Sequence, residues 1–367
     1  MKKIFFCCLL LLGACRNEQD QKTSIKFDPD REDYAFDPRN LFSSIRVIPL
    51  HAPSDILIDA ESDVEYDNDK FFVVETQRRK RVDIFDSNGQ YVGSVAARGR
   101  GGNEYIGINS FQIIDSIIAI YSYHNKSIYF YHTDGAFVRK ESLKYNPLHL
   151  LKVENGYWGY SGYSGVVPER VVRMDTEGQI VEKYLPVEGN IIPLSESGAV
   201  FTSYDRGVLV RESLRNEITY INENGEIETF LKFDFGKYNI PKTYFDNSDP
   251  YAAAEKLMKS DFVVMDRFFI NNDYAVLSVN FQKGGNEIKM ITSIGIENNN
   301  IWKWLKSDPK GSLSMFFSSA RQLTSNSELV LIVDADRVKE FSAAYPDLIP
   351  RLENSGDNPY IVLCRLK

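Results

Sequence analysis

Histidine is the residue type in this sequence that could most directly ligate a metal ion, and there are four: His51, His124, His132 and His149. None of them stands in an HxH or HExxH spacing, the local patterns that bring two imidazoles onto one ion. His124 and His132 fall within one unit of the sequence repeat described below. We expect one at the end of an inner strand and the other in the outer hairpin, so that their side chains point away from each other. We therefore predict no metal site and no cofactor.

Two other catalytic patterns are also incomplete. The segment GYSGYSG around Ser161 lacks the GxSxG spacing of a nucleophile elbow and has no helix after it, which favours a tyrosine-rich strand and turn. In GRGGNE, Glu104 stands where a dinucleotide-binding loop needs its third glycine, and a strand pattern follows where that loop must open a helix. The sequence does not decide whether the protein is an enzyme, although the incomplete patterns favour a protein without catalytic activity.

Two groups of side chains could face a polar ligand. A glycine-rich connector carries charged and aromatic residues at Arg98, Arg100, Glu104 and Tyr105. A dense aromatic cluster could offer a stacking platform for a sugar or a peptide, since aromatic faces and phenol groups suit partly hydrated ligands; its members are Tyr157, Trp158, Tyr160 and Tyr163. Solvated loop residues and packing between strands are the alternatives for the two groups.

The elements that must position these residues are β-strands. Short alternating segments rich in Val, Ile, Tyr and Phe are separated by Asn, Asp and Gly turns. Four hairpins share one plan, in which an apolar strand runs into Asp or Asn, a glycine follows, and a second alternating strand begins. The turn glycines are spaced 46, 43 and 47 residues apart, at Gly89, Gly135, Gly178 and Gly225.

A recurring four-stranded antiparallel unit of about 40 to 50 residues is typical of a β-propeller. Each hairpin then forms the outer half of one blade. Counting every strand once gives an all-β, six-bladed propeller in which the amino-terminal strand Ile45–Leu50 completes the last blade and closes the ring. A partly helical insertion near 237–261 interrupts the repeat, with Asp249 and Pro250 at the start of its predicted helix.

The first unit resembles the connection between blades of NHL-type propellers. The residues that match are Asp86, Gly89, Gly99, Gly101, Glu104 and Tyr105, whereas the proline expected after the aromatic is absent. This resemblance implies a fold and little about activity.

The amino terminus predicts export. Lys2 and Lys3 precede a short apolar run, and the residues from Leu12 to Cys15 resemble the lipobox of bacterial lipoproteins. We predict a signal peptide over 1–14, a lipidated Cys15 followed by a flexible tether to residue 40, and the propeller over 41–367. The whole chain thus resembles the six-bladed propeller lipoproteins of Bacteroides-type bacteria, which implies an outer-membrane address on either face.

Charge excludes one class of partner. The formal net charge is −8, and removal of the signal peptide with its two lysines makes it −10, which argues against nucleic acid. We expect a membrane-anchored module that binds a protein, peptide or glycan of the envelope. An envelope hydrolase or lyase with its site in the central channel, and a structural subunit of an outer-membrane assembly, are the alternatives.

Overall fold

The computed structural model describes residues 24–30, 37–164, 166–189, 191, 198–246, 249–284, 286–295, 303–306, 319–349, 352 and 358–367. The predicted signal peptide, Cys15 and most of the predicted tether lie outside these residues. Within the described ranges, no helix combines the length and the apolar character needed to cross a bilayer.

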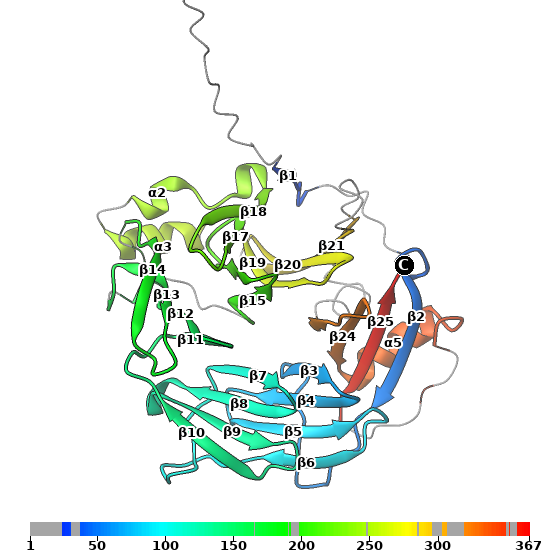
Figure 1. Cartoon of the computed structure of the whole chain (residues 1–367). Helices are drawn as coiled ribbons and strands as arrows, with labels where there is room; N and C mark the ends of the chain where they lie inside the picture. The colour runs from blue at the N-terminus through cyan, green and yellow to red at the C-terminus, as the bar shows by residue number, and fades with distance from the viewer. Residues whose placement is uncertain are drawn as a thin grey trace, which may run out of the picture.

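Six sheets, each built on four antiparallel strands, surround a central space (Figure 1). The protein is therefore an all-β propeller. From the inner to the outer edge, the first three sheets contain β3 (Asp63–Asp67), β4 (Lys70–Glu75), β5 (Arg81–Asp86) and β6 (Tyr91–Val95); β7 (Ser110–Ile114), β8 (Ile117–Ser122), β9 (Ser127–His132) and β10 (Phe137–Ser142); and β11 (His149–Val153), β12 (Gly156–Tyr160), β13 (Glu169–Met174) and β14 (Ile180–Pro186).

The other three sheets follow the same plan. They contain β15 (Phe201–Tyr204), β16 (Gly207–Arg211), β17 (Glu217–Ile221) and β18 (Ile227–Asp234); β19 (Phe262–Ile270), β20 (Tyr274–Lys283), β21 (Asn286–Gly295) and β22 (Lys303–Lys306); and β23 (Ala320–Leu323), β24 (Glu328–Val333), β25 (Tyr360–Leu366) and β2 (Phe42–Pro49).

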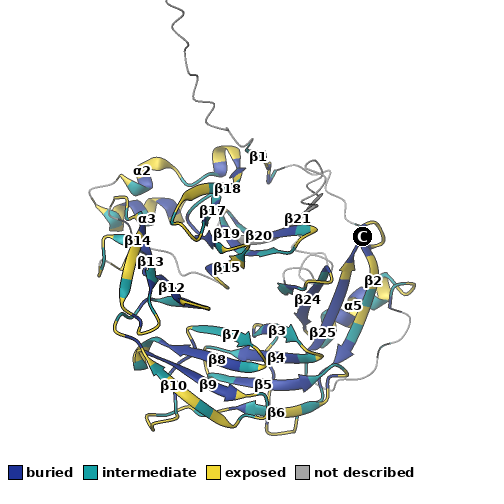
Figure 2. Cartoon of the chain, in the orientation of Figure 1, coloured by how far each residue is buried: buried dark blue, intermediate teal, exposed yellow. Residues whose placement is uncertain are grey.

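Burial explains why the middle strands are apolar on both faces. The four central residues of β4 are all buried, whereas the outer strand β10 is mostly exposed (Figure 2). A middle strand lies between the sheets of two neighbouring blades, so both of its faces pack against apolar side chains. Alternation of apolar and polar residues is consequently clearest in the outer strands.

The predicted outer hairpins are confirmed. Gly89 joins β5 to β6 with a φ of +76°, and the other three turn glycines also have positive φ. The Asp86 carboxylate accepts hydrogen bonds from the backbone N–H groups of Asn88 and Gln90, at 2.8 and 2.9 Å. The acidic or amide residue before the glycine therefore organises the turn through its side chain.

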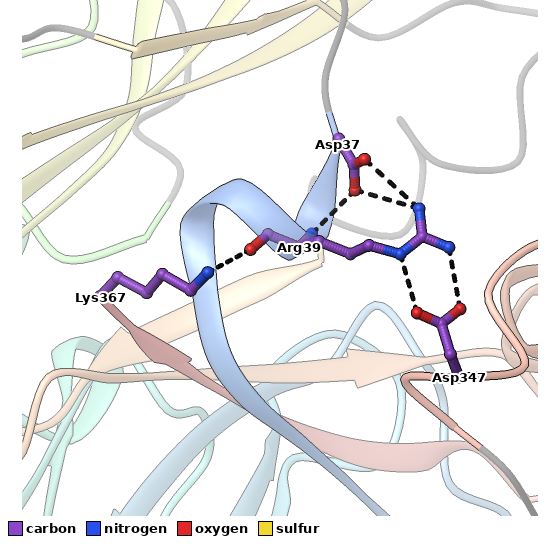
Figure 3. Close-up of polar contacts among 4 residues, drawn as sticks. All are labelled: Asp37, Arg39, Asp347 and Lys367. Carbon is purple, nitrogen blue, oxygen red and sulfur yellow. Dashed lines mark hydrogen bonds and ion pairs between the residues drawn. The ribbon is translucent and has the colours of Figure 1, made fainter.

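The amino-terminal strand β2 pairs with β25, the last strand of the chain, as the sequence predicts. Just before it, the short helix α1 (Pro38–Leu41) is tied to the end of the chain (Figure 3). The Arg39 guanidinium donates two hydrogen bonds of 2.8 Å to Asp347, and the Lys367 ammonium donates to the Arg39 carbonyl. Chain start and chain end thus hold each other in one sheet.

The expectation of a tether that is flexible up to residue 40 is wrong for its described part. The short strand β1 (Ile25–Lys26) adds in parallel to the outer strand β18. Phe27 is only 3% exposed, and its ring lies 5.9 Å from that of Phe235. Apolar side chains in a polar segment give it enough buried surface to dock on the propeller.

Three short helical elements lie in or next to the predicted insertion: η2 (Gly236–Tyr238), α2 (Lys242–Phe245) and α3 (Pro250–Met258). The Asp249 carboxylate caps α3 by accepting hydrogen bonds of 3.1 Å from the N–H groups of Tyr251 and Ala252. Elsewhere, η1 (Tyr123–Asn125) follows β8, and α5 (Ala335–Ala344) lies between β24 and β25.

Candidate functional site

A cavity of about 360 Å³ lies at the centre of the propeller, and we call it the funnel. Its walls come from the inner strands of all six sheets, β3, β7, β11, β15, β19 and β23. Polar residues contribute to these walls together with the half-buried Phe111 and Phe269. The propeller therefore brings residues that are distant in the sequence to one partly polar, partly aromatic space.

Two arginines and one aspartate form a charged group on one side of the funnel. Arg267 Nη1 donates to Asp63 Oδ1 over 2.6 Å, and Arg321 Nε lies 3.8 Å from the same oxygen. Burial, together with the positive charge of Arg267, lowers the pKa of Arg321 to about 10, so it remains protonated near neutral pH. Asp266 and Glu61 also act electrostatically on Arg321, so the charged group on this side of the funnel contains both signs.

Two glutamines on the funnel wall each clamp the next inner strand. Gln322 accepts a 2.7 Å hydrogen bond from the Tyr66 N–H and donates a 3.3 Å one to the Tyr66 carbonyl. Gln112 makes the same pair of contacts, of 2.7 and 3.3 Å, with the backbone of Lys152. A side-chain amide can serve a donor and an acceptor at once, which lets it substitute for strand pairing between blades.

Glu65 occupies the corresponding place on β3, the inner strand between those two clamps. Its carboxyl group accepts a hydrogen bond from the backbone N–H of Ile113 on β7. Burial, reinforced by the charge of Asp67, raises the pKa of Glu65 to about 7. Only the protonated form can also donate to a carbonyl as glutamine does, because an ionised carboxylate has no proton to give.

His149 lines the same funnel as a neutral imidazole. Its Nδ1 lies 3.2 Å from the Asn109 carbonyl oxygen, which can only accept, so Nδ1 carries the proton. Burial, with the nearby charge of Arg211, lowers the pKa of His149 to about 4. In the described part of the chain, no group of three or more His, Cys, Asp or Glu side chains is placed to hold a metal ion.

The predicted aromatic platform is not exposed. Tyr157, Trp158 and Tyr160 have exposed fractions of 1%, 4% and 2% and pack between neighbouring blades. Tyr163 is half-buried, and its hydroxyl accepts a 3.1 Å hydrogen bond from Arg215. Aromatic density in this stretch therefore reflects packing, because large rings fill the space between two sheets.

The glycine-rich connector divides into buried and exposed residues. Glu104 accepts a 2.8 Å hydrogen bond from the Gly101 N–H, and a Cβ on Gly99 would lie 1.9 Å from the same carboxylate. Tyr105 is fully buried and donates to the Val95 carbonyl over 3.0 Å. These residues fold the connector, whereas its two arginines, Arg98 and Arg100, are exposed.

Sequence reasoning missed the funnel side chains. Glu65, Gln112 and Gln322 are each the third residue of an inner strand, β3, β7 and β23 respectively. A glutamate or glutamine recurring as the third residue of an inner strand is the signal that could have identified them. Arg267 and Arg321 carry no such local signal, because their shared partner Asp63 lies about 200 residues or more away along the chain.

Comparison with known proteins gives a family and a fold. The model of the family described as a domain of unknown function (DUF4934) matches residues 24–365. No curated protein matches the chain significantly. Among solved structures, a candidate exported protein of Bacteroides fragilis is similar with a TM-score of 0.71 and 16% identity, over 94% of this chain and 99% of that one.

A second solved structure, a member of the duf4221 family from Bacteroides vulgatus, has a TM-score of 0.56 and 11% identity, over 89% of this chain and 97% of that one. At such identities these similarities show the fold alone. The function must be argued from the side chains of this protein.

Proposed function

The chain belongs to the family described as a domain of unknown function, DUF4934, and from that premise we propose that it is a binding module. Its ligand is the polar end of a glycan or peptide chain, held in the funnel. The observation that carries this proposal is the combination of a cavity of about 360 Å³ with polar groups and phenyl faces on its walls. Ligand sites usually have this make-up, with volumes of roughly 300 to 1,000 Å³.

Charged residues and apolar residues of the funnel would bind different parts of the ligand. The Arg267 and Arg321 guanidinium groups favour a ligand that carries an acidic or strongly polar group. The half-buried Phe111 and Phe269 offer apolar surface to the rest of the ligand. Gln112 and Gln322 are occupied by backbone contacts, so they shape the funnel rather than bind within it.

A hydrolase or lyase acting in the channel is the second candidate function. The observation that favours it is the presence of Glu65 and a neutral His149 on the walls of one cavity. A carboxyl group whose pKa is about 7 can both give and take a proton near neutral pH, as general acid-base catalysis requires.

The address and the closed ring are part of the same proposal. A lipid on Cys15 would anchor the protein to the outer membrane of the cell envelope, where its partners would be envelope proteins, peptides or glycans. The six sheets would be six blades of one closed ring, with β2 completing the last blade and the first blade NHL-like. The pairing of β2 with β25 supports this ring. A structural role in an outer-membrane assembly is the remaining alternative.

The test fills the funnel with a bulky side chain. Ala199 lines the cavity, and Ala199→Trp should reduce the affinity for any glycan or peptide identified by calorimetric screening by at least about tenfold, because the indole would occupy ligand space. Ala252→Trp, on the exposed surface of α3, is the matched control and should leave affinity unchanged. Equal affinities for the two variants would exclude the funnel as the binding site.

Glu65→Gln separates the two candidate functions. A binding module should retain ligand affinity in this variant, because the amide keeps the shape of the carboxyl group. An enzyme that uses Glu65 for proton transfer should still bind its substrate and lose turnover. Product formation by the variant at the wild-type rate would therefore eliminate a catalytic role for this residue.

A further inference from the structure

Five cationic side chains lie beside the mouth of the funnel. We call them the basic rim: Arg78, Arg79 and Lys80 in the loop between β4 and β5, and Arg98 and Arg100 on the connector between β6 and β7. Both segments reach the funnel, because Thr76 precedes the loop and Asn109 follows the connector, and both residues line the cavity. The basic rim is therefore adjacent to the proposed ligand site.

The loop that carries three of these cations has a fixed backbone. The Glu75 carboxylate accepts hydrogen bonds from four consecutive N–H groups, those of residues 77 to 80, with distances of 2.6 Å for Gln77 and 2.8 Å for Arg78. Arg98 Nη1 donates to the Arg78 carbonyl over 3.2 Å and so joins the connector to the loop. The side chains of the basic rim are thus presented from a preorganised support.

The carboxylates of these segments are already engaged. Residues 75–83 and 96–105 carry six Arg and Lys side chains but only three Asp and Glu, in a chain whose net charge is −8. Glu75 binds the loop backbone, Asp83 pairs with Arg81, and Glu104 binds the Gly101 N–H. Among the described residues, no member of the basic rim forms an ion pair.

Such a surface favours a ligand that brings its own negative charges. Guanidinium groups bind carboxylate and sulfate groups through paired hydrogen bonds, and a local positive field raises the rate of encounter with anions. An acidic peptide would gain little from the backbone here, because the N–H groups of Gly99, Tyr105 and the loop already have acceptors. Recognition therefore falls to side chains.

An aromatic group flanks the basic rim. Lys80 Nζ and His124 Cδ2 both lie within 3.9 Å of the place that a Cβ on Gly107 would take. The ring of His124 in turn meets the half-exposed ring of Tyr123, with centroids 5.8 Å apart. A partly exposed ring beside cations suits a sugar that stacks while its acidic substituent is bound.

We propose that the basic rim binds an acidic polysaccharide, one whose sugars carry carboxylate or sulfate groups. This surface is distinct from the funnel and does not require that the funnel binds a ligand. The carboxylate and the sulfate form of the ligand share one chemistry, so a polymer of each kind serves as a probe.

The experiment measures binding of the purified full-length protein to polygalacturonate, dextran sulfate and neutral dextran. Arg78→Gln combined with Arg100→Gln is the informative variant, because the side chains of Arg78 and Arg100 make no hydrogen bond within the described residues. Lys232→Gln combined with Lys256→Gln removes the same charge from exposed positions elsewhere and is the matched control.

The wild type should bind both acidic polymers and not neutral dextran, with affinity falling as salt rises. The rim variant should lose about threefold to tenfold in affinity, the effect expected for two exposed charge contacts, whereas the control should bind like the wild type. Equal loss in both variants, or equal binding of neutral dextran, would overturn the proposal.

Two further arms identify the partner. Binding of polyglutamate as tightly as the polysaccharides would assign the basic rim to acidic peptides and contradict our choice of partner. The Ala199→Trp variant should bind the acidic polymers like the wild type, since the funnel is not involved. Loss of polymer binding in that variant alone would place the acidic ligand in the funnel and refute a separate rim site.

Discussion

Glu65 should make the stability of this protein depend on pH. The glutamine clamps at equivalent positions on neighbouring strands donate to and accept from the next blade at every pH. Glu65 can do both only while protonated. Replacing it with glutamine should therefore install a clamp between β3 and β7 that does not titrate.

The magnitude follows from the pKa. A rise from the ordinary value of 4.5 to about 7 corresponds to roughly 3 kcal/mol, at about 1.4 kcal/mol per pKa unit. We take this as an upper figure, because water that enters the funnel would reduce the cost of the charged form.

The direction is set by which state holds the proton. Between pH 4.5 and about 7 the folded protein binds the Glu65 proton while the unfolded chain has released it, so the free energy of unfolding falls as pH rises. This contribution is complete below pH 4.5 and lost once pH has passed about 7. Glu65→Gln should match the wild type near pH 4 and exceed it by up to about 3 kcal/mol at pH 8.

Urea unfolding of both proteins at pH 4, 6 and 8 measures this difference, because titrations shared by the two proteins cancel. Glu228→Gln, at an exposed position on β18, is the control and should show no such trend. A difference between wild type and Glu65→Gln that is constant across pH, or that changes in favour of the wild type as pH rises, would refute the reasoning.

Three further substitutions test the fold. Gly89→Ala should cost about 2 kcal/mol or more in urea unfolding, since its φ is +76° and the added Cβ would lie 2.0 Å from the Pro49 carbonyl oxygen; Gly236→Ala, with positive φ but open space, should cost about 1 kcal/mol. Phe27→Ala should release residues 24–30 to proteolysis and cost about 2 to 4 kcal/mol, and unchanged protection would contradict the docking of β1. Asp249→Ala should cost about 1 kcal/mol and speed amide exchange in the first turn of α3, and unaltered exchange would count against the cap.

The arrangement of the funnel was not predictable from the sequence. Inner-strand side chains from different blades meet only after the sheets have assembled around the central space, so nothing in the local sequence links Asp63 to Arg267 or Glu65 to Ile113. The burial of the aromatic residues was likewise not predictable from the local sequence. Tyr157 and Trp158 have the composition of a binding platform, yet the neighbouring sheet covers them.

What the sequence by itself determined is what local chemistry controls. Positive φ favours glycine at the hairpin turns, and an aspartate before Pro250 starts α3. The last blade is one strand short and the amino-terminal strand has no blade of its own, which makes β2 the partner of β25. The tertiary structure alone decided which polar residues share the funnel and that Phe27 docks against Phe235. It also decided that the pKa of Glu65 is raised to about 7. Those properties depend on burial and on contacts across blades, which exist only once the propeller has formed.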